Sequence, residues 1–314
     1  MNLLPNHSEY QREILQGLMK VRKSISPKFL YDQRGSEIFE EICKLDEYYP
    51  VQAETEILKS YSGDMAARIG KNAIVIEPGC GNCRKVETLL QNLDRPTAYV
   101  ALDISEVFLK KTTKRLQDQF PKVPVYSVVA DYTRQFSLPL ELKKSKHKRV
   151  IFFPGSTIGN LDPEEAAPLL RRMGKLLRKG GGLLIGVDMK KDAKTLELAY
   201  DDPQGVTAEF NYNLLDRLNR EFSGSFDRKK FKYSANYNSQ KGRVEMFLVS
   251  SEHQTVRIAE QSIHLSAQES IHTENSYKYA PKEFIELAEM CEFRLNALWM
   301  DERKRFCMYY FEHL

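Results

Sequence analysis

The sequence contains few cysteines and no long apolar segment. Five cysteines occur among 314 residues, and this odd, thinly spread set favours a reducing compartment over a disulfide framework. No apolar run approaches the roughly 18 residues that a membrane helix needs. The first residues lack the basic region and the sustained apolar stretch of a secretory signal. These absences predict a soluble, cytoplasmic protein that does not contact membranes.

The chain also lacks a large excess of either charge. Lysine and arginine total 47 against 43 aspartate and glutamate residues, which gives a formal net charge of +4. A dedicated nucleic-acid binder usually carries a larger basic excess, so no nucleic-acid partner is expected. With 42% hydrophobic and 29% charged residues, the composition is that of a globular protein. At about 150 residues per domain, the length corresponds to one large domain or two modest ones.

Patterns that bind metals or activate nucleophiles are missing as well. The six histidines show no ligand spacing, and no Ser-His-Asp arrangement stands out. Cys80 and Cys83 form a C-x-x-C pair, but a zinc site needs a second pair of ligands that the other cysteines do not supply. No metal site is therefore predicted. The basic runs at 143–149 and 303–305 are interpreted as a solvated loop and a turn, with nucleic-acid contact as the lesser alternative.

The middle of the chain alternates short apolar runs with helical segments. The apolar runs are 73–76, 99–102, 125–129, 150–153 and 183–187, and the helices among them are 86–93, 105–116 (capped by Ser105) and 164–177. Strands that are buried on both faces and alternate with helices indicate a parallel α/β sheet. A helix at 281–291 and two strands at 294–300 and 306–311 would complete this sheet with an antiparallel pair.

Residues 189–280 interrupt this alternation. A helix at 204–222 precedes strand-like segments at 231–237, 244–250, 256–258 and 262–265, which we interpret as antiparallel strands of an inserted lobe. Near the start, apolar residues at helical spacing predict a helix over 11–23. The segment 1–60 is too short to be a domain, so we expect it to pack against another part of the chain.

The predicted strands end in residues suited to a nucleoside. Ligands of open α/β sheets bind beyond the carboxyl ends of the strands. These ends carry Gly79 and Gly81, Asp103, Asp131, the segment 155–160 and Asp188. The dinucleotide fingerprint needs a small residue where Arg84 stands, which disfavours a pyrophosphate cofactor. Two acidic residues after the second and third strands suit a ribose and a base edge, and S-adenosylmethionine fits best. The alternative is that Asp103 and Asp131 are only solvated strand ends.

Longer segments resemble one family, the histidine Nα-methyltransferases that form trimethylhistidine (hercynine) in ergothioneine biosynthesis. The resemblance runs nearly end to end. The residues that carry it are FLYD at 29–32, GS at 35–36 with Phe39, EYYP at 47–50, Glu54 with EIL at 56–58, EPGCG at 77–81, GSTIGNL at 155–161, YDD at 200–202, GVT at 205–207, FN at 210–211, EM at 245–246 and TENSYKY at 273–279. The glycine turn alone would be weak support, whereas the segments 155–161 and 200–211 are far more specific.

This resemblance implies a fold, and it assigns cofactor binding and amino-acid binding to different parts of the chain. The fold would be α/β, with a Rossmann-like class I methyltransferase sheet of parallel strands, an antiparallel C-terminal pair and an inserted α+β substrate-binding lobe. Residues 61–193 and 281–314 would bind S-adenosylmethionine, and residues 1–60 and 194–280 would bind the amino acid. The enzyme would transfer three methyl groups stepwise to the α-amino group of L-histidine. Its partner would be this small molecule alone, and the protein is expected to be a monomer.

The resemblance also implies roles for individual residues. The cofactor would be held by Tyr49, Gly79, Lys85, Asp103, Asp131 and Tyr132. The substrate would be bound by Tyr49, Asn160, Tyr200, Met246, Glu274 and Ser276. Asn160 and Tyr31 would be the catalytic residues. Asn160, together with Tyr200, would hold the α-carboxylate and the amino group and accept a hydrogen bond from the amine, and the proton of the amine would leave through water beside Tyr31. Glu274 and Ser276 would bind the two imidazole nitrogens, which favours histidine over tryptophan.

Two departures from the family pattern and three alternatives remain. Cys80 and Cys83 stand in a glycine turn where serine or threonine is more usual, and Asn275 stands where some relatives carry an apolar residue. The alternatives are a methyltransferase for tryptophan or another aromatic amino acid, a non-catalytic S-adenosylmethionine-binding or RNA-associated module, and a nicotinamide-dependent dehydrogenase. Arg84 and the antiparallel ending disfavour the last of these.

Overall fold

The computed structural model describes residues 7–134 and 136–314, and it divides the chain into two compact units. The first unit comprises Pro50–Lys190 and Tyr277–Leu314. The second comprises the described residues up to Tyr49 together with Lys191–Ser276. The boundaries fall at 49/50, 190/191 and 276/277, where the sequence predicted 60/61, 193/194 and 280/281. The assignment of cofactor binding to one unit and amino-acid binding to the other stays a prediction.

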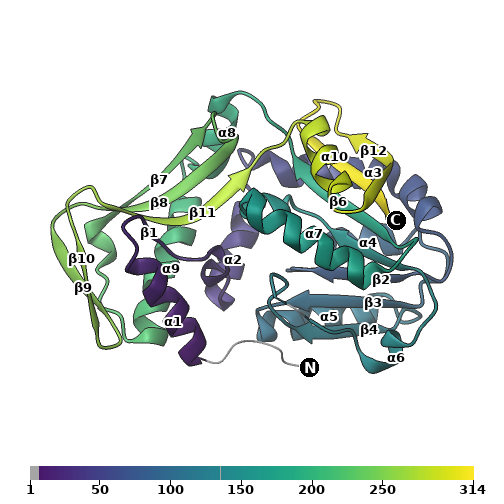
Figure 1. Ribbon diagram of the computed structural model, residues 1–314, viewed down its shortest axis with the longest axis horizontal. Coiled ribbons are helices and arrows are strands. Elements are labelled where there is room, and N and C mark those ends of the chain that lie inside the picture. The colour runs from purple at the N-terminus through teal and green to yellow at the C-terminus, as the bar shows by residue number, and fades with distance from the viewer. Residues whose placement is uncertain (1–6, 135) are drawn as a thin grey trace. The chain divides into compact units, whose positions relative to one another are not determined.

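A seven-stranded sheet forms the centre of the first unit. Its strands are β2 (Ile74–Pro78), β3 (Ala98–Asp103), β4 (Val125–Val129), β5 (Arg149–Phe153), β6 (Gly182–Asp188), β12 (Phe293–Met300) and β13 (Phe306–His313). They lie in the order β12-β13-β6-β5-β2-β3-β4 (Figure 1). Strands β2 to β6 pair in parallel, and β13 is antiparallel to both β6 and β12. The predicted parallel sheet with an antiparallel C-terminal pair is confirmed.

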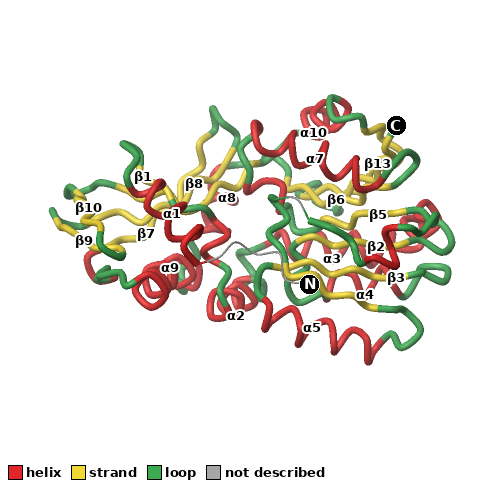
Figure 2. The backbone as a smooth tube through the Cα atoms, turned by 60° about the horizontal axis from the view of Figure 1, so that its bottom comes forward, coloured by secondary structure: helices red, strands yellow, loops and turns green. Residues whose placement is uncertain are grey.

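Helices cover both faces of this sheet. They are α3 (Tyr49–Ile69), α4 (Arg84–Leu90), α5 (Glu106–Gln119), α6 (Leu140–Lys143), α7 (Pro163–Leu177), α10 (Pro281–Glu289) and the short 3₁₀ helix η2 (Thr157–Asn160). Apolar side chains of α7 and α10 pack on one face, and those of α3, α4 and α5 pack on the other. Figure 2 shows α7 and α10 on one side of the strands and α5 on the other. Since β2, β5 and β6 are buried throughout, polar chemistry is confined to the ends of these strands.

The second unit combines a small sheet with helices. Its four-stranded sheet has the order β1-β11-β8-β7, from β1 (Lys23–Ser24), β11 (Ser270–Tyr277), β8 (Arg243–Ser250) and β7 (Phe231–Asn238), and a hairpin joins β9 (Gln254–Ile258) to β10 (Gln261–Leu265). Its helices are α1 (His7–Leu18), α2 (Gln33–Ile42), α8 (Ala193–Tyr200) and α9 (Val206–Phe222), with 3₁₀ helices η1 (Pro27–Leu30) and η3 (Arg228–Lys230). The antiparallel pairing of β7 with β8 and of β9 with β10 confirms the strands predicted there.

The helix predicted over 11–23 is wrong at its end. Helix α1 stops at Leu18, and Lys23 already belongs to β1, which pairs in parallel with β11. A Cβ added at Gly17 would lie 2.1 Å from the carbonyl oxygen of Ser24. The glycine therefore lets the chain turn back and pack against the last turn of the helix. Strand β11 itself had not been predicted as a strand, because it mixes polar and apolar residues without alternation.

Two local expectations need correction in the first unit. Ser105 stands at the N-terminal cap of α5, but its side chain makes no capping hydrogen bond, and its backbone N–H donates to Asp103. The basic run at 143–149 is not a wholly solvated loop. Arg149 is buried at the start of β5, where its guanidinium donates to the carbonyl oxygens of Leu142, Lys143 and Leu176.

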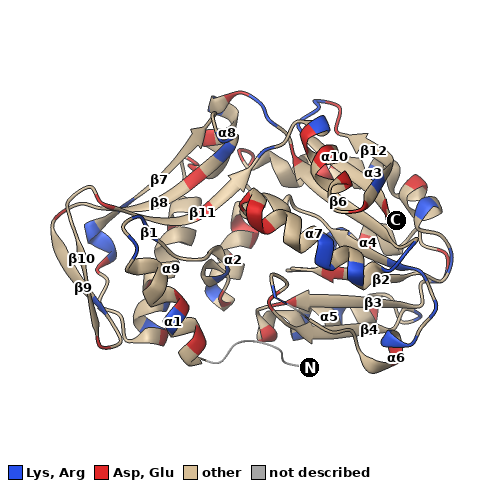
Figure 3. Ribbon diagram, viewed as in Figure 1, with Lys and Arg blue, Asp and Glu red and all other residues tan. Residues whose placement is uncertain are grey.

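The remaining basic residues are distributed with acidic ones. Residues 303–305 lie in the turn between β12 and β13, as predicted, and Arg305 donates to Asp301 at 3.0 Å. Figure 3 shows Lys and Arg interspersed with Asp and Glu over the helices and loops. Within the described parts of the chain, we found no helix of the length and apolar character that crossing a membrane requires.

Candidate active site

A glycine turn follows β2 and leaves space at the carboxyl edge of the sheet. Gly79 and Gly81 have positive φ angles of 66° and 52°, which favour glycine. A Cβ added at Gly81 would meet nothing within 4 Å. A Cβ at Gly79 would lie 3.3 Å from Cε1 of Tyr132, so the ring of Tyr132 packs close to the turn. The backbone here can approach a ligand without an intervening side chain.

The carboxylate of Asp103 is fixed at the end of β3 beside this turn. One oxygen accepts from the backbone N–H of Gly81 at 3.0 Å, and the other accepts from that of Ser105 at 2.9 Å. Burial raises the pKa of Asp103, and these backbone hydrogen bonds oppose the rise. Each carboxylate oxygen keeps a second lone pair, so the side chain can accept from two neighbouring hydroxyl groups.

Asp131 and Tyr132 follow β4 at the same edge. Asp131 is buried, and one of its oxygens accepts from both the backbone N–H and the hydroxyl of Thr133 at 2.9 and 2.5 Å. The ring of Tyr132 packs edge-on against Phe153, with 5.6 Å between the centroids. Asp131 is therefore a buried, oriented carboxylate, and the alternative of a merely solvated strand end is wrong for it.

The segment 155–161 forms a constrained loop after β5. Gly155 and Ser156 have positive φ angles of 80° and 56°, and the hydroxyl of Ser156 accepts from the backbone N–H of Asp188 at 2.9 Å. A Cβ at Gly159 would lie 2.7 Å from the carbonyl oxygen of Tyr277. Asn160 ends the helix η2 that this loop contains. Its backbone position is thus fixed from two directions.

In the second unit, a buried hydroxyl pair joins α8 to β11. The hydroxyl of Tyr200 and that of Ser276 lie 2.8 Å apart, and both side chains are buried. Tyr233 donates to the backbone carbonyl of Tyr200 at 2.6 Å, which fixes the end of α8. The ring of Tyr48 meets that of Tyr200 edge-on at 5.8 Å. Tyr200 is therefore oriented by contacts from three other segments of the chain.

Glu274 and Met246 lie in neighbouring strands of the same unit. Glu274 is buried in β11, two residues before Ser276, so regular strand geometry places both on one face. Met246 is buried in β8, and its backbone carbonyl accepts from the hydroxyl of Thr273 at 3.2 Å. Glu274 is therefore not a surface carboxylate.

Tyr48 packs edge-on against both Tyr200 and Phe39, so ring contacts connect predicted residues of this unit. Burial raises the pKa of Tyr48 well above its ordinary value, and Tyr200, Tyr31 and Glu274 add to the rise through their charges. The ring of Tyr31 packs against Phe39 and Phe210, with centroid distances of 5.6 and 5.3 Å. The structure thus brings Tyr31, Tyr200 and Glu274 into one aromatic, largely buried neighbourhood.

Tyr49 is held by a lysine that the sequence did not single out. Lys191 donates to the Tyr49 hydroxyl at 2.6 Å, and its Nζ lies 4.5 Å from the ring centroid. The ammonium therefore sits on the hydroxyl and not over the centre of the ring. Tyr49 belongs to the second unit although it was predicted to contact the cofactor as well as the substrate.

The predicted residues divide between the units. The first unit holds Gly79, Lys85, Asp103, Asp131, Tyr132 and Asn160, and the second holds Tyr31, Tyr49, Tyr200, Met246, Glu274 and Ser276. Sequence reasoning gave no role to Glu54 or Lys278, and it named Asp188 only as the end of the fifth predicted strand. Glu54 pairs with Lys85 at 2.6 Å, and Asp188 pairs with Lys278 at 2.7 Å. The signal for Lys278 and Glu54 was present only in the resembling segments, where neither was assigned a function.

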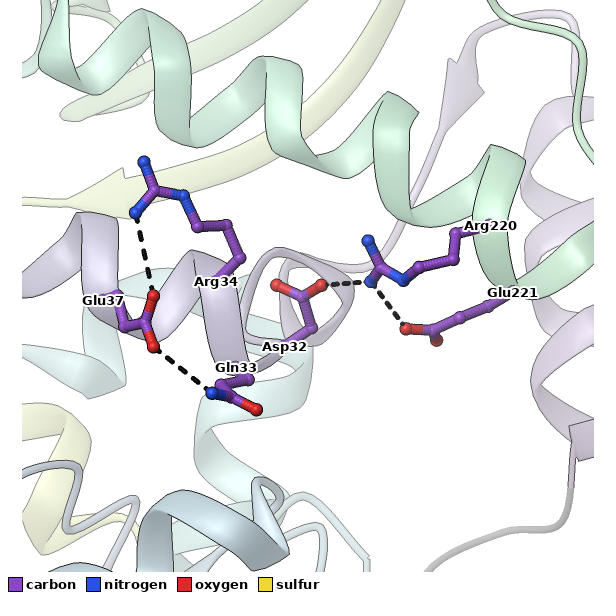
Figure 4. A pocket seen from close by; sticks show the side chains of 6 residues that line it. All are labelled: Asp32, Gln33, Arg34, Glu37, Arg220 and Glu221. Carbon is purple, nitrogen blue, oxygen red and sulfur yellow. Dashed lines mark hydrogen bonds and ion pairs between the residues drawn. The ribbon is translucent and has the colours of Figure 1, made fainter.

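A separate polar pocket of about 380 Å³ lies in the second unit. Figure 4 shows that its side chains pair with one another: Arg220 with Asp32 and Glu221, and Glu37 with Arg34 and Gln33. Its charged groups are thus already neutralised locally. None of the predicted site residues lines this pocket.

Comparison with known proteins agrees with this geometry. A family profile described as "Histidine-specific methyltransferase, SAM-dependent" matches residues 10–313. The chain is 36% identical to the histidine N-alpha-methyltransferase of Mycobacterium tuberculosis, over 94% of this chain and 92% of that one. It is 29% identical to ergothioneine biosynthesis protein 1 of Schizosaccharomyces pombe, over 87% of this chain and 37% of that longer protein.

A solved structure extends the comparison to the fold. The CcbJ methyltransferase from Streptomyces caelestis aligns with a TM-score of 0.50 at 11% identity, over 83% of this chain and 96% of that one. At this identity the likeness concerns the fold alone. Since the family profile covers nearly the whole chain, the protein belongs to the family of S-adenosylmethionine-dependent, histidine-specific methyltransferases.

Proposed function

We propose that this enzyme transfers three methyl groups in succession to the α-amino group of L-histidine, which yields hercynine. The observation that carries the proposal is the buried polar set on β11 and α8, where Glu274 lies beside the hydroxyl pair of Ser276 and Tyr200. Such buried polar groups penalise any ligand that leaves them unpaired. A ring with one N–H donor and one acceptor nitrogen satisfies a carboxylate and a hydroxyl together.

The edge of the first unit fits the cofactor of this family. An adenosine with its ribose hydroxyls fits three features of this edge. These are the open backbone at Gly81, the carboxylate of Asp103, whose two oxygens can both accept hydrogen bonds, and the buried Asp131. We propose that Gly79, Lys85 and Tyr132 complete this binding site, and that Tyr49 also binds the cofactor. Bound S-adenosylmethionine supplies a methyl group on a positively charged sulfur.

Residues of this chain would orient the substrate amine and provide a path by which its protons leave. An α-ammonium has a pKa near 8, so a modest local shift suffices to free its lone pair, and no strong base is required. We propose that Asn160 accepts a hydrogen bond from the amine and directs the lone pair. Each released proton would leave through water beside Tyr31, and Tyr200, together with Asn160, would hold the α-carboxylate and the amino group. Tyrosine faces can also stabilise the methylated ammonium.

The imidazole would be recognised in the second unit. Glu274 would accept from the ring N–H, Ser276 would donate to the other nitrogen, and Met246 would close the pocket with apolar contact. An indole ring has a donor but no acceptor nitrogen, so it would leave Ser276 without its ligand partner. Histidine is therefore the preferred substrate in this proposal, ahead of tryptophan.

Mass spectrometry of the reaction mixture tests the proposal directly. Purified protein is incubated with S-adenosylmethionine and histidine, tryptophan or tyrosine in parallel. We expect histidine to gain one, two and then three methyl groups, and Nα,Nα-dimethylhistidine to gain one. Equal rates with all three amino acids would contradict the assignment of histidine. A product with unmodified α-nitrogen, or an endpoint below three methyl groups under excess cofactor, would contradict the proposed sequence of transfers.

A further inference from the structure

Glu54 occupies a position in the first unit that no part of the proposed mechanism uses. It lies in α3, its side chain is completely buried, and one carboxylate oxygen is 2.6 Å from the Nζ of Lys85. Both oxygens accept from the backbone N–H of Gly155, at 2.8 and 3.0 Å. One carboxylate thus connects a residue predicted to bind the cofactor with the first residue of the loop that carries Asn160.

The surrounding backbone is shaped to admit this carboxylate. A Cβ added at Gly186, in β6, would lie 2.2 Å from Oε1 of Glu54. A Cβ added at Gly155 would lie 3.0 Å from the Nζ of Lys85. Two glycines, one in β6 and one in the loop after β5, therefore leave room for one ion pair. Complete burial of an ionised carboxylate is costly unless the carboxylate is paired with an opposite charge and hydrogen-bonded. The carboxylate of Glu54 has both kinds of partner.

The Glu54–Lys85 ion pair lies near further acidic residues at the carboxyl edge of the sheet, where we propose that the cofactor binds. Burial is the main cause that raises the pKa of Glu77. Lys85 lowers this pKa, and Glu54 and Asp103 add to the rise, so these side chains share one electrostatic environment. A lysine ammonium has three N–H donors. Its hydrogen bond to Glu54 fixes the direction of the other two. A lysine without such an anchor would keep several rotamers, and binding would cost the entropy of ordering it.

We propose that Glu54 is a positioning residue, which orients the Lys85 ammonium for the cofactor and holds the Gly155 end of the loop that bears Asn160. The inference rests on the proposed function in one respect, the role of Lys85 in cofactor binding. It extends that function by naming the carboxylate that orients Lys85 for cofactor binding. Glu54 touches neither reacting atom in this account and acts through Lys85 and Gly155.

The variant Glu54→Gln separates the two contacts. Glutamine keeps an oxygen that can accept from the Gly155 N–H, but it replaces the charge beside Lys85 with a neutral amide. We expect the dissociation constant of S-adenosylhomocysteine, measured by calorimetry, to rise about tenfold or more, as for loss of a hydrogen bond to a charged group. The KM for histidine at saturating S-adenosylmethionine should change less than about threefold.

A matched control and a double-mutant cycle exclude a merely structural effect. Glu56 lies on the same helix and accepts from a backbone N–H, that of Glu302, at 2.8 Å, so Glu56→Gln should leave cofactor affinity unchanged. In the Lys85→Met background, Glu54→Gln should weaken binding little further, because the two residues act as one unit. Additive losses, equal losses with Glu56→Gln, or unchanged affinity in Glu54→Gln would overturn the inference.

The calorimetric measurement also keeps this inference distinct from the proposed reaction. A protein that binds S-adenosylhomocysteine through the Glu54–Lys85 unit but does not methylate histidine would contradict the proposed substrate and support the positioning role. A protein that trimethylates histidine but binds the cofactor equally well in Glu54→Gln would support the proposed function and overturn the positioning role.

Discussion

Asp188 and Lys278 form an ion pair in which both side chains are fully buried, with Nζ 2.7 Å from Oδ2. Asp188 ends β6, and its backbone N–H donates to Ser156, so the pair adjoins the constrained loop after β5. Removing one partner of a buried pair leaves an uncompensated charge.

We therefore expect Lys278→Met to lower the free energy of unfolding by about 3–5 kcal/mol, measured by urea denaturation. The control is Lys110→Met, which breaks an exposed pair with Glu106 and should leave the free energy of unfolding nearly unchanged. The double variant Asp188→Asn/Lys278→Met should recover part of the loss, because no unpaired charge then remains. Equal losses in Lys278→Met and Lys110→Met would contradict this account.

Substitution of Glu274 tests the recognition of the imidazole. Glu274→Gln keeps the shape of the side chain but removes the charged acceptor. We expect the KM for histidine to rise about 10- to 100-fold, whereas the dissociation constant of S-adenosylhomocysteine stays within about twofold. Glu252→Gln, at an exposed carboxylate that pairs with Lys230, should alter neither value. Parallel losses of substrate and cofactor affinity in Glu274→Gln would show that the carboxylate has another role.

Glu77 makes stability depend on pH in a defined direction. Burial raises the pKa of Glu77 from 4.5 to about 8, although its hydrogen bond from Tyr99 and the charge of Lys85 oppose the rise. The folded protein therefore holds a proton that the unfolded chain releases. This contribution to stability is complete below pH 4.5 and is lost as the pH rises towards 8 and beyond.

The variant Glu77→Gln mimics the protonated side chain at every pH. We expect its unfolding free energy, relative to that of the wild type, to increase between pH 5 and pH 8 by about 1 kcal/mol per pH unit. Urea denaturation of both proteins at each pH measures this difference. A difference that stays constant across the range would mean that Glu77 does not titrate there.

Gly159 should tolerate no side chain, for steric reasons alone. A Cβ would lie 2.7 Å from the carbonyl oxygen of Tyr277 and 3.2 Å from its nitrogen, and these backbone atoms cannot rotate away. We expect Gly159→Ala to displace η2 and to reduce kcat/KM for histidine by about tenfold or more. Gly63→Ala is the control, since a Cβ there would meet nothing within 4 Å. That variant should keep full activity and gain up to about 1 kcal/mol of stability.

The sequence allowed the central sheet to be predicted because its strands are continuous apolar runs that end in glycine or aspartate. Asp103 and Asp131 were expected at the carboxyl edge for the same reason, and the structure places both there. The second unit was less predictable, because β1 has only two residues and pairs with β11, far along the chain. Periodicity within a short window carries no signal for such a long-range pairing.

The partners of buried charged side chains were the least predictable part of the structure. Glu54 meets Lys85 and Gly155 only after α3 packs on the sheet, and nothing in the local sequence distinguishes it from Glu56. Arg149 likewise stands in a basic run, yet it is buried because three carbonyl oxygens accept its N–H groups. Burial of such polar residues is decided by partners from other segments, not by their neighbours in the chain.

The missing side chain at Gly186 couples two positions that lie far apart in the sequence. Any larger residue at 186 would collide with the carboxylate of Glu54, so each position restricts what the other accepts. A combinatorial library that varies 186 alone should return glycine, whereas one that varies 54 and 186 together should also return pairs with a shorter acid opposite a small residue. In relatives that carry a shorter acid at the position of Glu54, we therefore expect the residue at the position of Gly186 to differ as well.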